Sequence, residues 1–515
     1  MLGMSRRVLL GGIAIVARIA RAAPGPWSEA DEIVARLATH RPPPGRDFPV
    51  ELRGGDCRPA FHEAIAACHQ AGGGRVMVPA GDWYCGGPIR LKSNVEFHLS
   101  RNCRIRFSPD PADYAKDGDI DCGANGKLVR SRWQGNDCLN FSPLIYAIGE
   151  SNIALTGEDW TSLLDGQANG PKGWWSMRTA DNPDPLALPA MSEAGTPVEQ
   201  RIFGLGHNLR PCMIEFVECD NVLMQGYHVT NAPFWLHHPV ACKNVVIRQV
   251  LANSLGPNND GFDPESCDMV LCDRVTFNTG DDCIAIKSGK NLDTKYGPAS
   301  NHVIQNCVMN SGHGGLTLGS EQAGGIRNIF ARDLLMKNEN WATSPLNIAI
   351  RIKANMNRGA VVENFHVRNV TLPNGVALDP GFFRPIEGGM LSDKKISTRK
   401  GGVFTIDCDY QPERDPVRNR PPIVRNVSIS GVKVSAPPKK DNGCYQAFII
   451  LGPVESDYNG PPGAVFYPVE NISMSDCDFG KPSNGEQPFF LFNVRGLALR
   501  NVKIAGKAYD GVLNG

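Results

Sequence analysis

A short motif recurs along this chain of 515 residues: an asparagine or aspartate followed by alternating apolar residues. Alternation of this kind predicts β-strands. Closely spaced copies are 23 and 25 residues apart, which is too short for propeller blades and indicates a solenoid. The pattern of leucine-rich repeats is absent, so we predict an all-β fold: a right-handed parallel β-helix with three short sheets per coil. Copies begin at Asn94, Asn152, Asn221, Asn244, Met269, His302, Asn328, Asn364, Asn426 and Asn471.

Two residue types recur at similar spacing and should form columns in a solenoid. We expect Cys219, Cys242 and Cys267 to form an inward ladder of thiols, since cysteine is often buried as a small hydrophobe. An asparagine also follows successive strands, and we expect a repeated turn there because asparagine tolerates left-handed backbone. These asparagines are Asn231, Asn253, Asn278 and Asn310.

One end of the solenoid and two insertions are also visible in the sequence. Residues 59–70 have helical spacing, with Phe61, Ile65 and Cys68 on one face. A solenoid needs capped ends, so this short helix is the predicted N-terminal cap. Residues 167–210 and 375–400 are rich in proline, glycine and charge, and we expect loop insertions there that shape the binding face.

The first residues have the anatomy of an export signal. Arg6 and Arg7 precede an apolar run over 8–17 and a small-x-small site at 20–22. The arginine pair resembles a twin-arginine signal; the alternatives are an ordinary signal peptide or a membrane anchor, but the run is too short to span a bilayer. We therefore predict a signal over 1–23, a single β-helix domain over 24–515, and a periplasmic or secreted protein without a membrane span when mature.

Charge and cysteine spacing exclude some partners. The formal net charge is zero at pH 7 and the isoelectric point is about 7.1, so no overall basic field points to nucleic acid. An anionic substrate would have to be held by local Lys and Arg. No C-x-x-C pair with matching histidines suggests zinc. Disulfide pairing and oligomeric state stay open.

Polar clusters occur in consecutive repeats of the central region. Asp260 ends an NND cluster, Asp281 and Asp282 form part of GDD, and His313 is the centre of GHG. Adjacent coils of a parallel sheet are about 4.8 Å apart, so these groups should share one face within two coils. Like charges this close raise at least one carboxyl pKa. One protonated and one ionised carboxyl are what glycoside hydrolysis requires.

The order NND, GDD, GHG and RIK resembles the family-28 glycoside hydrolases, the polygalacturonases and their relatives. The segments 258–267 (NNDGFDPESC), 279–290 (TGDDCIAIKSGK) and 312–321 (GHGGLTLGSE) are similar to the bacterial exo-acting branch of that family. The resemblance covers most of the predicted mature chain. It implies a hydrolase for the α-1,4-galacturonosyl bonds of pectin or polygalacturonate.

The resemblance also implies roles for individual residues. Asp281 would be the general acid, while Asp260 and Asp282 would activate water, with inversion at carboxyl separations of roughly 6.5–9.5 Å. His313 would orient the acid or set its proton state. No metal or cofactor is implied, because carboxyls perform both proton transfers. Arg351 and Lys353 would bind the galacturonate carboxylate, and Tyr410 matches a substrate-contacting tyrosine of the family.

Alternatives remain on the same residues. One is a hydrolase for another pectic bond, such as that of rhamnogalacturonan or xylogalacturonan. Another is a β-helix carbohydrate-binding protein without activity, against which the intact acid and base positions argue. A pectate lyase would rely on calcium and an arginine base, and GDD followed by GHG is not that pattern.

Overall fold

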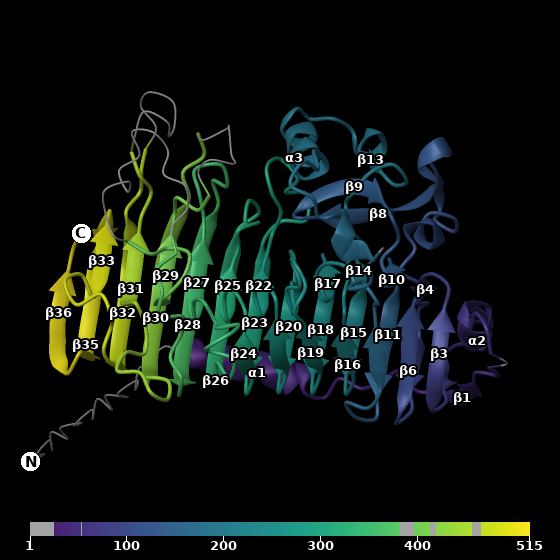
Figure 1. Ribbon diagram of the computed structural model, residues 1–515, viewed down its shortest axis with the longest axis horizontal. Coiled ribbons are helices and arrows are strands. Elements are labelled where there is room, and N and C mark those ends of the chain that lie inside the picture. The colour runs from purple at the N-terminus through teal and green to yellow at the C-terminus, as the bar shows by residue number, and fades with distance from the viewer. Residues whose placement is uncertain (1–24, 53, 172, 382–395, 412–418, 456–464) are drawn as a thin grey trace, which may run out of the picture.

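The structure is a computed structural model that describes residues 25–52, 54–171, 173–381, 396–411, 419–455 and 465–515. The described chain winds into a right-handed parallel β-helix, as predicted (Figure 1). Its coils stack from β1 (Arg46–Pro49) to β33 (Phe489–Phe492), β34 (Val494–Arg495) and β35 (Leu497–Ile504), and β36 (Lys507–Leu513) turns back antiparallel to β35. The predicted export signal lies outside the described residues.

Strands of successive coils form three rows. The first two rows belong to one 22-stranded sheet. The first row comprises β2 (Gly74–Val78), β5 (Val95–Leu99), β11 (Ser151–Gly157), β15 (Asp220–Gln225), β18 (Lys243–Arg248), β20 (Asp268–Asp273), β23 (Ala299–Gln305), β26 (Ile326–Met336), β28 (Val361–Leu372), β30 (Ile423–Val434) and β32 (Val469–Asp478). The second row comprises β3 (Gly81–Cys85), β6 (Cys103–Phe107), β12 (Leu163–Asp165), β16 (His228–Thr230), β19 (Leu251–Ser254), β21 (Thr276–Thr279) and β24 (Val308–Ser311).

The third row consists of a four-stranded and a six-stranded sheet. The two continue one another through backbone bridges from Val240 to Glu265 and from Glu265 to Lys287. The row comprises β4 (Ile89–Arg90), β10 (Ile145–Ile148), β14 (Ile214–Val217), β17 (His237–Val240), β22 (Ile284–Ile286), β25 (Leu316–Leu318), β27 (Ile350–Lys353), β29 (Gly402–Asp407), β31 (Gln446–Leu451) and β33.

Alternation along the strands explains the core and one helix that the sequence did not reveal. In β18, Val245 and Ile247 face the interior of the coil, whereas Val246 faces outward and is also fully buried. Such outward apolar residues recur from coil to coil. They are covered by α1 (Pro26–Leu37), which runs across the first row (Figure 1). The helix over 26–37 was not predicted.

Helices and 3-10 turns otherwise occupy the ends and insertions. The predicted cap is α2 (Arg58–Gln70), which lies at the N-terminal end and buries Phe61, Ile65 and Cys68 as expected (Figure 1). Insertion 167–210 is not purely loop, since it contains α3 (Asp184–Glu193). Short 3-10 segments are Pro111–Tyr114, Gly123–Asn125, Trp174–Met177 and Val198–Gln200. In the described part of the chain, no helix combines the length and apolar character needed to cross a membrane.

Asn253, Asn278 and Asn310 stack in successive coils, and Asn310 donates its side-chain amide to Asn278, but the repeated left-handed turn lies at a different place from the one predicted. Asn231 has a left-handed backbone, but Asn253, Asn278 and Asn310 lie within strands β19, β21 and β24. The asparagines that begin the repeats are the left-handed ones, and several donate side-chain amides from one coil to the next. These bonds run from Asn152 to Asn94, Asn221 to Asn152, Asn328 to Asn301, Asn364 to Asn328, Asn426 to Asn364 and Asn471 to Asn426.

The cysteines are thiols in this structure. All sixteen cysteines are described and all are free. Cys219, Cys242 and Cys267 are buried one after another in successive coils, as the ladder predicted. The thiol of Cys242 donates to the carbonyls of Phe216 and Val240. These three cysteines therefore pack as small core residues, and the Cys242 thiol has backbone carbonyls as its hydrogen-bond partners.

Candidate active site

The four polar clusters converge on the outer face of the third row. Asp260 lies just before the segment that bridges to β22, while Asp281 and Asp282 directly precede β22. His313 precedes β25, and Lys353 ends β27. Since these strands are neighbours in the row, groups separated by almost a hundred residues meet at one place.

The three aspartates form a tight cluster. One carboxylate oxygen from each of Asp260, Asp281 and Asp282 lies within 4.8 Å of the other two. The exposed fraction of the side chain is 18% for Asp281 and 0% for Asp282. Asp260 is also buried. Asp281 is therefore the carboxylate of the three that a molecule arriving from solvent can reach most directly.

The nearest-oxygen distances do not test the carboxyl separation expected for inversion. The nearest oxygens of the three carboxylates are closer than 6.5 Å because consecutive coils place the groups one above another, and GDD puts two of them side by side. Distances between nearest oxygens are shorter than distances between carboxyl groups, so the two measures are not directly comparable. Carboxylate spacing alone thus carries no assignment of stereochemistry here.

His313 and Asp281 are a hydrogen-bonded pair at the mouth of the cluster. His313 Nδ1 lies 2.9 Å from Asp281 Oδ1, and half of the His313 side chain is exposed. The Asp281 carboxylate raises the pKa of His313. Burial raises the pKa of Asp281, but the charge and hydrogen bond of His313 outweigh burial and hold it below its ordinary value. Without substrate, the shared proton therefore resides mainly on the imidazole.

Asp260 has the opposite electrostatic environment. Burial, followed by the nearby charges of Asp281 and Asp263, raises the pKa of Asp260 well above its usual range. Its oxygen Oδ1 has no hydrogen-bond partner. Lys287 Nζ lies 3.8 Å from the other oxygen and favours ionisation. The expected rise of one carboxyl pKa thus falls on Asp260.

Lys353, Arg351 and Tyr410 lie together on the far side of Asp282. Lys353 Nζ donates to Asp282 Oδ2. The ring centroid of Tyr410 is 5.0 Å from the guanidinium carbon of Arg351 and 5.4 Å from Lys353 Nζ. Both cations are almost fully buried. The structure therefore brings the three predicted substrate-binding residues together, with the cations held by protein groups.

Close packing around the carboxylates explains two local sequence features. A Cβ atom on Gly280 would lie 2.2 Å from the carbonyl oxygen of Gly256, so only glycine allows the bend before Asp281. Asn259, the middle residue of the NND cluster, donates to the carbonyls of Ala232 and Phe234 and accepts from Ser254. Asn259 thus holds the turn through bonds that do not involve the carboxylate of Asp260.

Several charged residues of the site were missed by sequence reasoning. Lys287 Nζ lies 3.1 Å from Glu321 and 3.4 Å from Asp263, and it sits 4.3 Å from the ring centroid of Trp235. Lys287 and Glu321 occur within the quoted motifs IKSGK and GHGGLTLGSE. Both residues occur close to alternating buried apolar residues of their strands. This alternation was the sequence signal that their side chains face outward.

The row is covered on the N-terminal side of the carboxylates. An antiparallel hairpin of β8 (Lys127–Trp133) and β9 (Asn136–Asn140) lies over β10, β14 and β17, flanked by β7 (Ile120–Asp121) and β13 (Ile202–Phe203) (Figure 1). Arg132, from this hairpin, pairs with Glu265 and Asp137 and is 1% exposed. Ser131 Oγ donates to Glu215 at 2.9 Å. This hairpin precedes the predicted insertion and was not foreseen.

The second insertion covers the row on the other side. Arg351 donates to the carbonyl of Thr398 at 3.1 Å, and Ile396 packs on Ile449 and Leu451. Residues 382–395 of the predicted insertion, including Lys394, lie outside the described chain. The three clustered aspartates thus lie between two covered stretches of the same row.

Comparisons with known proteins match this arrangement. Residues 204–381 match the family described as glycosyl hydrolases family 28. A probable polygalacturonase of Vitis vinifera is 28% identical over 325 residues, which are 61% of this chain and 57% of that protein, less than two thirds of its length. An endo-polygalacturonase of Pectobacterium carotovorum subsp. carotovorum is 31% identical over 370 residues, 67% of this chain and 79% of the relative. The crystal structure of a hyperthermoactive exopolygalacturonase from Thermotoga maritima is 31% identical, with a TM-score of 0.74, and the match covers 94% of this chain and 99% of that one.

Proposed function

The chain belongs to glycosyl hydrolase family 28, and we propose that it hydrolyses α-1,4-galacturonosyl bonds of pectin or polygalacturonate from a chain end. The names of its relatives support the substrate class, and the convergent carboxylates support the reaction. The proposed localisation, periplasmic or secreted, rests on the sequence of residues 1–23 alone. The observation that carries the exo mode is the covered row on both sides of the carboxylates.

Asp281 is the proposed general acid. Electrostatics alone would favour Asp260, since its pKa is the raised one. Accessibility decides for Asp281, because its carboxylate is the most exposed of the three and contacts His313. The pair holds one proton, and Asp281 passes it to the leaving glycosidic oxygen while His313 sets its position. General acid catalysis of this kind contributes about 10²–10⁴-fold in rate.

Asp260 and Asp282 are the proposed bases that activate water. Each has one buried oxygen, Oδ1, without a protein partner. Buried polar atoms nearly always find a partner, including water, so these two oxygens suit a nucleophilic water between them. Lys353 Nζ donates to the other oxygen of Asp282, and the charge of Lys287 favours the ionised form of Asp260. Attack from this side gives inversion, as in the family that the chain resembles.

The substrate carboxylate is the proposed partner of the cationic side of the opening. Lys353 and Arg351 place two positive charges beside Asp282, and Tyr410 offers a ring against them. A charge-assisted hydrogen bond contributes about 1.5–3 kcal/mol. Such a site favours free galacturonate over its methyl ester.

The covered row accounts for cleavage from a chain end. A long polymer would have to continue past the carboxylates over β17 and β14, where Glu265 and Glu215 are sealed under Arg132 and Ser131. Displacing this hairpin would strip paired buried charges, which is costly. A polymer therefore cannot continue past the carboxylates in this direction, and it enters by its terminus.

Product analysis tests the proposal. Polygalacturonate is incubated with the protein, and products, viscosity and the anomer first formed are followed over time. We expect mono- or digalacturonate from the earliest samples, a slow fall in viscosity and an inverted first product. A rapid fall in viscosity with a ladder of oligomers would show internal cleavage. Products absorbing in the ultraviolet as unsaturated uronides would show a lyase, and turnover of another pectic polymer alone would change the substrate.

A further inference from the structure

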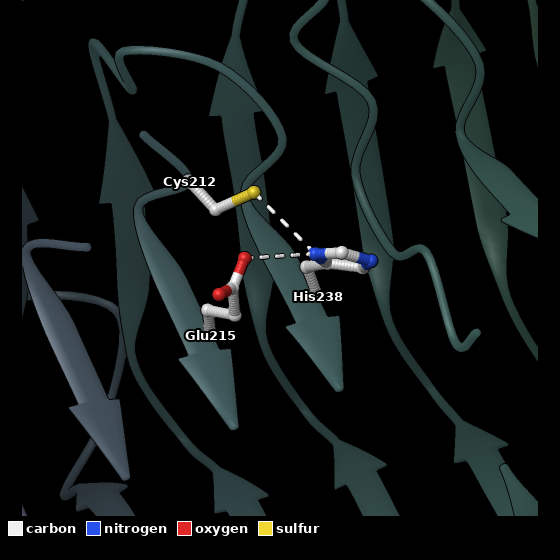
Figure 2. A group of neighbouring side chains, drawn as sticks. All are labelled: Cys212, Glu215 and His238. Carbon is white, nitrogen blue, oxygen red and sulfur yellow. Dashed lines mark hydrogen bonds and ion pairs between the residues drawn. The ribbon is translucent and has the colours of Figure 1, made fainter. Parts of the chain in front are cut away.

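A second cluster of potential ligands lies in the same row, beneath the β8–β9 hairpin. Glu215 of β14 and His238 of β17 occupy paired positions on neighbouring strands, and Cys212 lies at the end of the insertion that returns to β14. Figure 2 shows the three side chains pointing toward one another. All three are buried, with at most 2% of each residue exposed. The cluster is separate from the catalytic aspartates.

The distances suit a tetrahedral metal ion. Cys212 Sγ lies 3.5 Å from His238 Nδ1, and Glu215 Oε2 lies 3.1 Å from the same nitrogen. A tetrahedral zinc ion with ordinary bond lengths separates sulfur from nitrogen by about 3.5 Å and nitrogen from oxygen by about 3.3 Å. One ligand atom from each residue lies within 4.8 Å of the others. An ion between them requires only small shifts of these atoms.

The surroundings of His238 complete the pattern of a metal ligand. Its other ring nitrogen, Nε2, lies 3.0 Å from Glu265 Oε2, and Glu265 is paired with Arg132. Metal-bound histidines almost always donate the remaining ring N–H to a carboxylate or carbonyl, which fixes the ring. The rings of Trp235 and His238 are in edge-to-face contact, with their centroids 4.8 Å apart. The imidazole is thus oriented with Nδ1 toward the thiol and Glu215.

We propose that Cys212, Glu215 and His238 bind one divalent ion of the zinc class. A thiolate, an imidazole and a carboxylate form a ligand set that selects zinc over calcium or magnesium. Binding releases the thiol proton to solvent, because the thiolate is the form that binds the metal. The pairing of Arg132 with Glu265 does not involve the proposed ligand atoms and can be kept.

The ion would tie the insertion to the β-helix. Cys212 belongs to the segment that closes the insertion, whereas Glu215 and His238 belong to two consecutive coils. Trp235 lies between this site and Lys287 of the catalytic region. Its role is therefore to fix the N-terminal wall of the opening, without contact with the reacting atoms. Since the ligands have no open path to solvent, the ion enters as the chain folds.

Metal analysis tests the site without reference to activity. The full chain is unfolded with chelator and refolded with either zinc or cobalt(II), and unbound metal is removed by gel filtration. We expect about one equivalent of metal per chain, since structural sites of this kind bind tightly on folding. The cobalt form should show a thiolate charge-transfer band in the near ultraviolet. Refolded wild-type protein with less than about a tenth of an equivalent would overturn the proposal, and would identify the cluster as a hydrogen-bonded network alone.

Two variants locate the metal. Cys212→Ser should lose the charge-transfer band and most bound metal, while Cys242→Ser, a buried cysteine with backbone partners, should keep both. If Cys212→Ser does not refold, His238→Gln gives the same comparison with the thiol retained. Equal metal content in wild type and either ligand variant would place the ion elsewhere and reject these ligands.

Discussion

Two charged clusters lie side by side on the third row and behave in opposite ways. The sealed cluster, made of Arg132, Glu215, His238 and Glu265, lies under the hairpin, and its charges face partners at hydrogen-bond distance. The catalytic cluster, made of Asp260, Asp281, Asp282, His313 and Lys353, has two buried carboxylate oxygens with no partner. Its mouth at His313 is half exposed.

The difference shows that the role of a polar residue in this row depends more on whether another segment covers it than on its position in the strand. Both clusters use outward-facing side chains of equivalent strands. Under the hairpin, unpaired charge would be costly, and every charge is therefore matched. In the opening, unmatched oxygens are retained because they await water or substrate. The comparison predicts chemical effects for one cluster and stability effects for the other.

The largest effect should come from the catalytic carboxylates. We expect Asp281→Asn, Asp282→Asn and Asp260→Asn each to reduce kcat on polygalacturonate by about 10²–10⁴-fold, the contribution of a positioned acid or base. The measurement is release of reducing ends. The matched control is Asp273→Asn, a buried carboxylate of β20 that accepts from Gln305 and Asn306 away from the site.

An aryl galacturonide with a good leaving group distinguishes acid from base. Asp281→Asn should recover most activity on that substrate, because the leaving group no longer needs a proton. Asp260→Asn and Asp282→Asn should recover none. The reverse pattern, with recovery in Asp260→Asn, would make Asp260 the acid, as its raised pKa alone suggests.

A smaller effect, on stability, should come from the sealed cluster. Arg132→Met removes the partner of the fully buried Glu265 and should lower the free energy of unfolding by about 3–5 kcal/mol. Denaturant titration near neutral pH measures it. The control is Arg130→Met on the same strand, whose pair with Glu199 is exposed on both sides and should contribute only about 0–1 kcal/mol. Equal losses in the two variants would remove the contrast between the clusters.

The smallest effect should be a displacement of the pH profile. Asp260 must be ionised to act as a base, so activity falls as the pH drops through its pKa. The charge of Lys287 lowers that pKa, and Lys287→Met should therefore move the acidic limb to higher pH, by roughly one unit or more. Lys337→Met, which changes an exposed lysine paired with Glu339, should leave the limb in place. A shift toward lower pH would contradict the assigned sign.

Repeating local patterns made the fold predictable, whereas contacts across the outer face did not. The strand alternation after Asn221 and Asn244 predicted the coils, and motif order predicted which aspartates meet. The helix 26–37 was missed because its partners, such as Phe330, lie some three hundred residues away. The repeated left-handed turn was misplaced because Asn253 and Asn278 occur in strands at the same spacing as the true turns.

The role of a site residue was predictable where it follows from the residue type. It was less predictable where the role depends on a contact with a residue distant in the sequence. Asp281 and His313 are a hydrogen-bonded pair, as the resemblance of their motifs implied. Arg351 was expected to face substrate, but its position under Thr398 depends on an insertion without periodicity. Likewise, nothing near Cys212 in the sequence indicates that His238 lies beside it.

Helix α1 has a consequence for the order in which the molecule folds. Its residues precede every coil in the sequence, yet Trp27 contacts Phe330 and Asp31 pairs with Arg332, about three hundred positions later. Closing so long a loop carries an entropic cost that grows with the logarithm of its length, and the surface that α1 covers is complete only when the coils through β26 have stacked. Full docking of this early helix therefore waits for a much later part of the chain. Protection of its amides from hydrogen exchange should report that the coils through β26 have formed.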